Sequence, residues 1–157
     1  MDNIYQMKVI LCENKDWILS EYAFSMYKPC MYQPTYETYL DSINKLISSA
    51  FNRIYTCETD GKVVGVLVIQ LAGRNAEIIG IAVSEQFQNQ GIGKYMIQQI
   101  MEKECLHSLI AQTDDDAVGF YRKCGFIIED EIKKYPDGIV VRYNCRLVNW
   151  KNKNLTR

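Results

Sequence analysis

The sequence predicts a mixed α/β fold in which about seven strands and four helices alternate along the chain. Two observations predict it. Apolar residues recur at helical spacing in some segments and form short β-rich runs in others. One such run, 78–83, also leads through a glycine-rich turn into an amphipathic segment, which is typical of a strand followed by a helix. Together they predict a central sheet flanked by helices.

The first fifty residues predict one strand and two helices. The strand covers about 5–11, and Asp16 is the expected N-cap of a helix that Lys28-Pro29 ends. A second helix is expected to start near Thr35, because apolar side chains then recur at helical spacing: Tyr39, Leu40, Ile43, Leu46 and Ile47.

The middle of the chain changes to strand periodicity. Segments 53–58 and 62–71 flank Thr59-Asp60-Gly61, and an Asp-Gly pair between β-rich runs predicts a hairpin. A turn at 72–75 then leads into a further strand at 76–83.

The last third is expected to contain two helices and three strands. A helix should cover 91–105 and a strand 107–113. One of Asp114, Asp115 and Asp116 is expected to cap the next helix, which runs through Lys123 and stops at Gly125. Strands at 127–133 and 139–147, joined around Pro136-Asp137-Gly138, complete the fold.

Length and charge indicate one domain, 1–157, with a small or peptide-like partner. The formal net charge is −1 without a polybasic segment, which argues against nucleic acid and anionic membranes. The longest apolar run, Val63–Leu71, is too short to span a bilayer, and the N-terminus does not resemble a signal peptide. We therefore expect a soluble, cytoplasmic monomer or homodimer without a membrane partner.

The six cysteines point to reduced thiols. They lie far apart without a Cys-x-x-Cys motif, and His107 is the only histidine, so no metal site is expected. His107 is expected to have a structural or surface role.

The segment after strand 76–83 indicates a phosphate-bearing ligand. It reads Gln88-Asn89-Gln90-Gly91-Ile92-Gly93, and glycines at a helix N-terminus allow a diphosphate to approach free backbone N–H groups. A Walker loop would require glycine at Gln88 and Ser or Thr at Tyr95, and a dinucleotide-binding loop would require glycine at Met96. Both alternatives are therefore unfavourable.

Two motifs carry a resemblance to a known family. Gln88, Gly91 and Gly93 resemble the acyl-CoA signature of the GNAT superfamily of N-acetyltransferases, and 116–126 resembles its second signature, which contains a Phe-Tyr pair and a Gly-Phe stop. The resemblance covers about 53–147. It implies a mostly antiparallel, twisted sheet and acetyl-CoA as the acyl donor.

The resemblance also implies site residues. Tyr121 matches the family tyrosine that protonates the departing thiolate, which a phenol can do only if its site helps. Glu77 matches a glutamate that some members use to deprotonate the amine. The residues implied for cofactor binding are Ile81, Ala82, Val83, Gln88, Asn89, Gln90, Gly91, Ile92, Gly93, Lys94 and Tyr121.

Within this set, the backbone carries most of the expected contacts. The amides of 88–94 should bind the diphosphate, and an amide near Val83 should bind the thioester oxygen. By strand alternation, Glu77 should share a face with Ile79, Ile81 and Val83. Packing alone remains an alternative for Tyr121, as does a solvated position for Glu77 and for Lys94.

The predicted function is transfer of an acetyl group from acetyl-CoA to a primary amine of a small molecule or peptide, by direct attack. Two alternatives stay open: a non-catalytic acyl-CoA-binding regulatory protein, and a structural domain that shares only the fold. Near-neutral charge does not select among amine acceptors.

Overall fold

A single mixed sheet organises the molecule in the computed structural model, which describes residues 6–149. Its seven strands lie in the order β1-β2-β3-β4-β5-β7-β6, and only the β4–β5 pair is parallel. The strands are β1 (Lys8–Leu11), β2 (Asn52–Thr59), β3 (Lys62–Ala72), β4 (Asn75–Val83), β5 (Ser108–Thr113), β6 (Ile127–Tyr135) and β7 (Gly138–Val148). The predicted mostly antiparallel sheet of about seven strands is confirmed.

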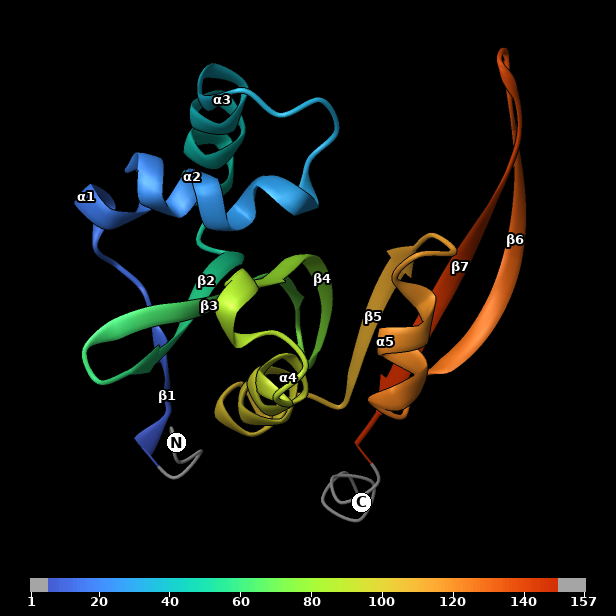
Figure 1. Ribbon diagram of the computed structural model, residues 1–157. Helices are drawn as coiled ribbons and strands as arrows, with labels where there is room; N and C mark the ends of the chain where they lie inside the picture. The colour runs from blue at the N-terminus through green and yellow to red at the C-terminus, as the bar shows by residue number, and fades with distance from the viewer. Residues whose placement is uncertain (1–5, 150–157) are drawn as a thin grey trace.

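Helices cover both faces of the sheet (Figure 1). Three lie over one face of β2–β4: α1 (Lys15–Ile18), α2 (Glu21–Tyr27) and α3 (Tyr36–Ile47). The other face carries α4 (Ile92–Lys103), and α5 (Val118–Lys123) packs on β6 and β7. Two short 3-10 turns are η2 (Lys28–Cys30) and η3 (Glu85–Phe87).

The first predicted helix is wrong in one respect, because it is two helices. Asn14, not Asp16, caps α1, and its side-chain oxygen accepts from the Trp17 amide. The chain then breaks at Ser20, whose hydroxyl accepts from the Ala23 amide and caps α2. Two successive caps satisfy two sets of free amides, so a turn replaces the continuous helix. α3 begins near Thr35 as predicted, and the Thr35 side chain is its N-cap.

Two buried clusters hold these layers together. The first lies between the sheet and α4 and α5, and includes Leu67, Ile69, Met96, Ile100 and Leu109, all fully buried. The second lies under α1–α3, and includes Ile18, Tyr39, Ile43 and Val68. Burial of these apolar side chains on both faces is the main stabilising term of the fold.

A β-bulge in β4 changes which residues face each cluster. Val68 pairs with Gly80 whereas Ile69 pairs with Ile78, so Ile79 is an extra residue on β4. Ala76 and Ile78 before the bulge, and Ile81 and Val83 after it, all belong to the α4 side.

β4 and β5 separate soon after they begin to pair. Their parallel ladder covers only 75–77 against 108–110, after which β4 continues with β3 and β5 continues with β7. Figure 1 shows the two strands diverging, with β5–β7 turned away from β2–β4. One edge of β4 beyond Glu77 is therefore left without a partner strand.

Candidate functional site at the β4–β5 separation

The unpaired edge of β4 presents the backbone of Ile81 and Val83. The Ser84 amide donates to the Val64 carbonyl of β3 at 2.8 Å. Because backbone direction alternates along a strand, the amides of Ile81 and Val83 point away from β3, into the space where β5 has diverged. Both residues belong to the predicted cofactor-binding set, whereas the polar backbone groups of Ala82 face β3.

Two side chains form hydrogen bonds with the carbonyl oxygens of the same two residues. The Cys30 thiol of η2 donates to the Ile81 carbonyl at 3.2 Å, and the Gln88 side-chain amide donates to the Val83 carbonyl at 3.1 Å. Neither bond uses the N–H groups. The β4 edge therefore keeps two hydrogen-bond donors directed into the separation.

The loop after β4 brings a helix N-terminus to this edge. Asn89 and Gly91 both have left-handed backbone (φ 63° and 80°), and α4 begins directly after Gly91 without a side-chain cap. The amides of Ile92, Gly93 and Lys94 occupy the first helical turn, which has no intrahelical acceptors. This arrangement favours an anion such as a diphosphate.

The two glycines of the first signature have different physical roles. Gly91 faces open space, and its positive φ is what requires glycine. A methyl group on Gly93 would lie 2.8 Å from the Phe120 ring of α5. The first signature thus contacts the second directly, because Gly93 allows α4 to approach the Phe-Tyr pair.

Tyr121 follows Phe120 in α5, and its side chain is nearly buried. It packs edge-on against Phe120 and Phe126, with ring centroids 5.1 and 5.2 Å apart. Burial raises the pKa of Tyr121 above its usual range, and the thiols of Cys145, Cys30 and Cys124 raise it further. A positive neighbour, one of the two forms of help considered for this phenol besides a helix terminus, is not among the causes that shift this pKa.

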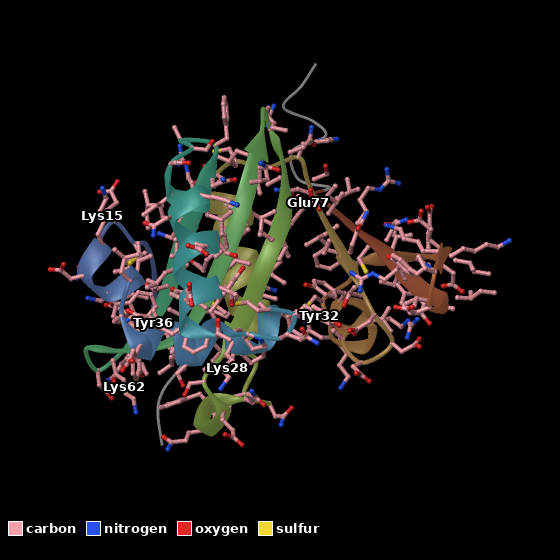
Figure 2. All side chains as sticks on the ribbon, turned by 90° about the horizontal axis from the view of Figure 1, so that it is seen from above. Lys15, Lys28, Tyr32, Tyr36, Lys62 and Glu77 are labelled. Atoms are coloured by element: carbon pink, nitrogen blue, oxygen red, sulfur yellow. The ribbon has the colours of Figure 1, made fainter. Side chains whose placement is uncertain are left out.

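Glu77 lies on the sheet face opposite to the one predicted. Its neighbours Ala76 and Ile78 face α4, so Glu77 faces the α1–α3 side, together with Gly80 and Ala82 beyond the bulge. The expected grouping with Ile81 and Val83 is wrong because Ile79 shifts the alternation by one residue. Figure 2 shows Glu77 toward one end of β4.

A pocket of about 240 Å³ lies next to Glu77 on this same face. Ile110 of β5 pairs with Glu77, and it lines the pocket with residues from all three outer strands. These are Ile110, Ala111, Gln112, Ile127, Glu129, Asn144, Cys145 and Arg146. Apolar and charged groups alternate there, as in small-molecule sites.

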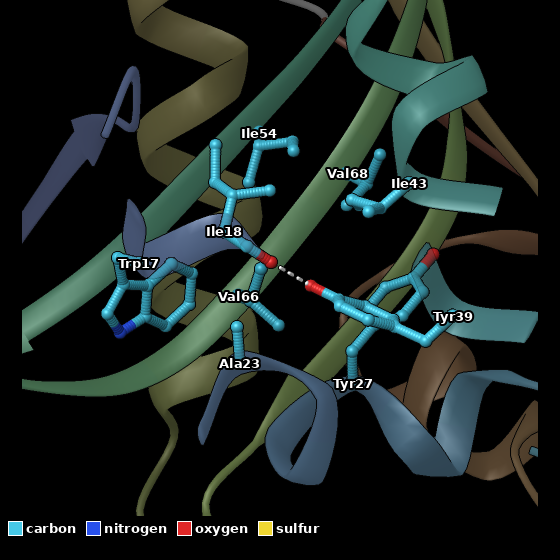
Figure 3. A pocket seen from close by; sticks show the side chains of 9 residues that line it. All are labelled: Trp17, Ile18, Ala23, Tyr27, Tyr39, Ile43, Ile54, Val66 and Val68. Atoms are coloured by element: carbon cyan, nitrogen blue, oxygen red, sulfur yellow. Dashed lines mark hydrogen bonds between the residues drawn. The ribbon is translucent and has the colours of Figure 1, made fainter. Parts of the chain in front are cut away.

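The helical layer itself offers no comparable space. The cavity under α1–α3, drawn in Figure 3, has a volume of about 10 Å³, which is room for about one water molecule. The hydroxyl of Tyr39, which lines this cavity, donates a hydrogen bond to the Ile18 carbonyl at 2.6 Å. This cavity is therefore too small to hold a molecule much larger than water.

Two other conspicuous polar residues differ in their contacts. Asp114, one of the three predicted caps, accepts from the amides of Asp116 and Ala117 just before α5. The His107 backbone amide donates to the Arg74 carbonyl, whereas its buried side-chain Nδ1 has no hydrogen-bond partner in the described residues. Within residues 6–149, no three His, Cys, Asp or Glu side chains gather as metal ligands, and no helix is long and apolar enough to cross a bilayer.

Comparison with known proteins decides the family. The sequence profile of the Acetyltransferase (GNAT) family matches residues 17–126, which is most of the chain. This chain belongs to the GNAT acetyltransferase family. The match contains the first signature and the second through Phe126, and it extends the resemblance into α1–α3.

Solved structures with the same fold include acetyltransferases with different acceptors. A chimera of the spermidine N-acetyltransferase SpeG from Vibrio cholerae and hSSAT aligns over 97% of this chain and 99% of its own (TM-score 0.73, 18% identity). The ribosomal-protein-S18-alanine N-acetyltransferase of Escherichia coli aligns over 90% and 93% (TM-score 0.66, 16% identity). At these identities the likeness shows the fold alone.

Two further relatives bear on the ligand and on the sequence. A GNAT family acetyltransferase from Elizabethkingia anophelis, solved with acetyl-CoA bound, aligns over 92% of this chain and 99% of its own (TM-score 0.67, 19% identity). The uncharacterized protein YdhI of Bacillus subtilis (strain 168) is 31% identical over 72 residues, which cover 42% of this chain and 44% of that protein. The match thus spans less than half of YdhI.

The family resemblance implies that the aromatic residues from Tyr27 to Tyr39 lie where the first two helices wall the acceptor pocket, but sequence reasoning assigned no individual role to Tyr27 and none to Cys30, which the structure brings to the same edge of β4. Their segment lies some fifty residues before β4 in the chain, and neither residue belongs to a signature. The cluster of aromatic residues between Tyr27 and Tyr39 was the available signal, since packing does not obviously account for every ring.

Proposed function

We propose that this protein is an N-acetyltransferase that transfers the acetyl group of acetyl-CoA directly to a primary amine of a small molecule or peptide. The observation that carries the proposal is the separation of β4 from β5. It leaves the Ile81 and Val83 amides directed away from β3 at one edge, and the loop after β4 leads to the uncapped N-terminus of α4. A thioester oxygen and a diphosphate are the two polar parts of acetyl-CoA that need such donors.

In this proposal the backbone binds the donor and orients its thioester. The α4 amides of Ile92, Gly93 and Lys94 hold the diphosphate, and the loop residues Gln88, Asn89 and Gln90 shape the approach to it. The Val83 amide holds the pantetheine arm. The Ile81 amide holds the thioester oxygen and stabilises it as it gains negative charge. Gln88 keeps the Val83 carbonyl occupied.

Tyr121 is proposed to give a proton to the departing sulfur. The nitrogen of the amine forms a bond to the carbonyl carbon while the carbon–sulfur bond breaks, and the electron pair of that bond goes to sulfur. Burial raises the pKa of Tyr121, so its hydroxyl is fully protonated at neutral pH. The same dry surroundings raise the proton affinity of the thiolate, which keeps the transfer feasible.

Glu77 is proposed to accept a proton from the amine, through a water molecule. Its side chain faces the acceptor side of the sheet, beside the pocket that Ile110, Gln112 and Arg146 line. This pocket is proposed to receive the body of the acceptor. Its apolar floor and mixed charges suit a small molecule or a peptide end.

The first experiment is a calorimetric titration of the protein with acetyl-CoA, with NADH and ATP as controls. The expected result is saturable binding of acetyl-CoA alone, with a Kd on the order of micromolar. Release of free thiol is then followed across a panel of amines. Absence of acetyl-CoA binding would overturn the proposal, whereas binding without thiol release for any amine would favour the non-catalytic alternative.

A further inference from the structure

The tyrosines of α2 and α3 differ in what their hydroxyls contact. The hydroxyls of Tyr22, Tyr36 and Tyr39 each donate to a backbone carbonyl, of Val63, Leu19 and Ile18 respectively. Tyr27 has no such partner among residues 6–149, although its side chain is only 7% exposed. The Tyr27 oxygen is nevertheless not among the fully buried side-chain atoms without a partner in the described residues, so it remains accessible to water or to a ligand.

Tyr27 lies directly against the bulged part of β4. A methyl group placed on Gly80 would be 2.6 Å from Cε2 and 2.7 Å from Cζ of the Tyr27 ring, and would also collide with its hydroxyl. Gly80 follows the bulge residue and precedes Ile81, whose amide points into the β4–β5 separation. Glycine at this position thus admits the phenol to the edge where the thioester is proposed to lie.

Cys30 connects Tyr27 to Tyr121. Its thiol donates to the Ile81 carbonyl, and its proximity raises the pKa of both phenols. Tyr27 approaches β4 from the α1–α3 side and Tyr121 approaches from the α5 side. Two tyrosine hydroxyls without a hydrogen-bond partner in the described chain thus belong to the two clusters on opposite faces of the sheet, and Cys30 influences both of them.

We propose that the Tyr27 hydroxyl is a second catalytic group, which holds the acceptor amine against the thioester carbon while Tyr121 serves the sulfur. This inference rests on the proposed function and deepens it. The side of the sheet favours the assignment, because Tyr27 shares its face of β4 with Glu77 and with the pocket that receives the acceptor.

The chemistry requires Tyr27 to stay neutral throughout. Burial is the main cause that raises its pKa, so the hydroxyl neither gains nor loses a proton at neutral pH. Its oxygen accepts a hydrogen bond from one N–H of the amine and leaves the nitrogen lone pair free to attack. The amine proton leaves through the Glu77 route, and the products are the amide and the free thiol. Holding the nucleophile in this way lowers the entropic part of the barrier.

Tyr27→Phe tests the proposal with a matched control, Tyr39→Phe. Because the Tyr27 hydroxyl has no partner in residues 6–149, its removal should leave the Tm and the acetyl-CoA Kd unchanged. The expected loss is about 10- to 100-fold in kcat/KM for the amine that gives the fastest thiol release in the wild type. Tyr39→Phe loses the 2.6 Å bond to Ile18 and should lower the Tm while retaining kcat.

The outcomes separate this inference from the proposed function. If wild type transfers acetyl to an amine and Tyr27→Phe does so at an equal rate, the role of Tyr27 is wrong and the proposed function stands. A fall in the Tm of Tyr27→Phe that accompanies the fall in rate would also overturn the role of Tyr27, because it would show that the hydroxyl stabilises the fold. If wild type binds acetyl-CoA but acetylates no amine, the proposed function falls and the Tyr27 role falls with it.

Discussion

The two faces of β4 are built by different means. The α4–α5 face presents glycines and backbone amides that follow two short sequence motifs, and its side chains pack tightly, as Gly93 does on Phe120. The α1–α3 face presents side chains from distant segments, among them Glu77, Tyr27 and Cys30. A backbone site needs a particular local chain geometry, whereas a side-chain site needs only the right group in the right place.

The three fold relatives named above are acetyltransferases, and the two whose acceptors are named, SpeG and the S18-alanine enzyme, act on different ones. In the proposed function, backbone groups of the α4–α5 face bind the donor and side chains of the α1–α3 face bind the acceptor. A change confined to one face should therefore leave the other binding function intact.

Tyr121→Phe is expected to have the largest effect, because it removes the proposed proton donor without changing the shape of the core. We expect kcat to fall by about 100-fold or more, with the acetyl-CoA Kd nearly unchanged. Stopped-flow thiol release and calorimetry would measure the two quantities. Tyr143→Phe is the control, since that hydroxyl of β7 donates to the Asp115 carboxylate in the exposed loop before α5. Turnover of Tyr121→Phe at the wild-type rate would exclude the proposed role.

Gly93→Ala should disturb the packing of α4 on α5, on the α4–α5 face of β4, through a steric collision. The added methyl group meets the Phe120 ring at 2.8 Å, and such overpacking costs about 1–3 kcal/mol of unfolding free energy. We expect a lower Tm and weaker acetyl-CoA binding, because the α4 N-terminus must shift. Adding Phe120→Leu should restore part of both. A Gly93→Ala protein with wild-type stability and affinity would contradict the packing account.

Gly80→Ala is the matching change on the α1–α3 face of β4. The methyl group collides with Tyr27 and should displace its ring from the β4 edge. We expect kcat/KM for the amine to fall roughly 10-fold, comparable to the loss of one hydrogen bond, while acetyl-CoA binding is retained. A loss of acetyl-CoA affinity as large as that of Gly93→Ala would show that the two faces are not separable.

Glu77→Gln should have the smallest effect, since a water molecule is proposed to carry the proton. We expect kcat to fall several-fold near neutral pH and the pH–rate profile to change, because the carboxylate that receives the proton is gone while the amine must still lose it. Glu102→Gln, which removes an exposed carboxylate of α4 away from this pocket, is the control. An unchanged pH–rate profile would remove Glu77 from the mechanism.

Much of the α4–α5 face of β4, which is proposed to bind the acetyl donor, could be predicted from local sequence. Strand and helix periodicity located every strand, and Gln88, Gly91 and the Phe120-Tyr121 pair carried the family resemblance that the comparison confirmed. The roles of individual site residues remain predictions. Local periodicity succeeds here because each motif acts through the backbone of its own segment, which neighbouring residues determine.

The side chains that meet on the α1–α3 face of β4, which is proposed to bind the acceptor, were determined by the tertiary structure. One extra residue, Ile79, moves Glu77 to the opposite face of β4, and a strand pattern with a period of two residues does not reveal where such a shift occurs. Tyr27 and Cys30 meet Ile81 only because α2 and η2 pack across the sheet, some fifty residues away in the chain. Gly93 likewise needs its partner Phe120 before its packing role is visible. The sequence by itself determined the strand order along the chain and the donor motifs, whereas long-range packing determined which side chains meet there.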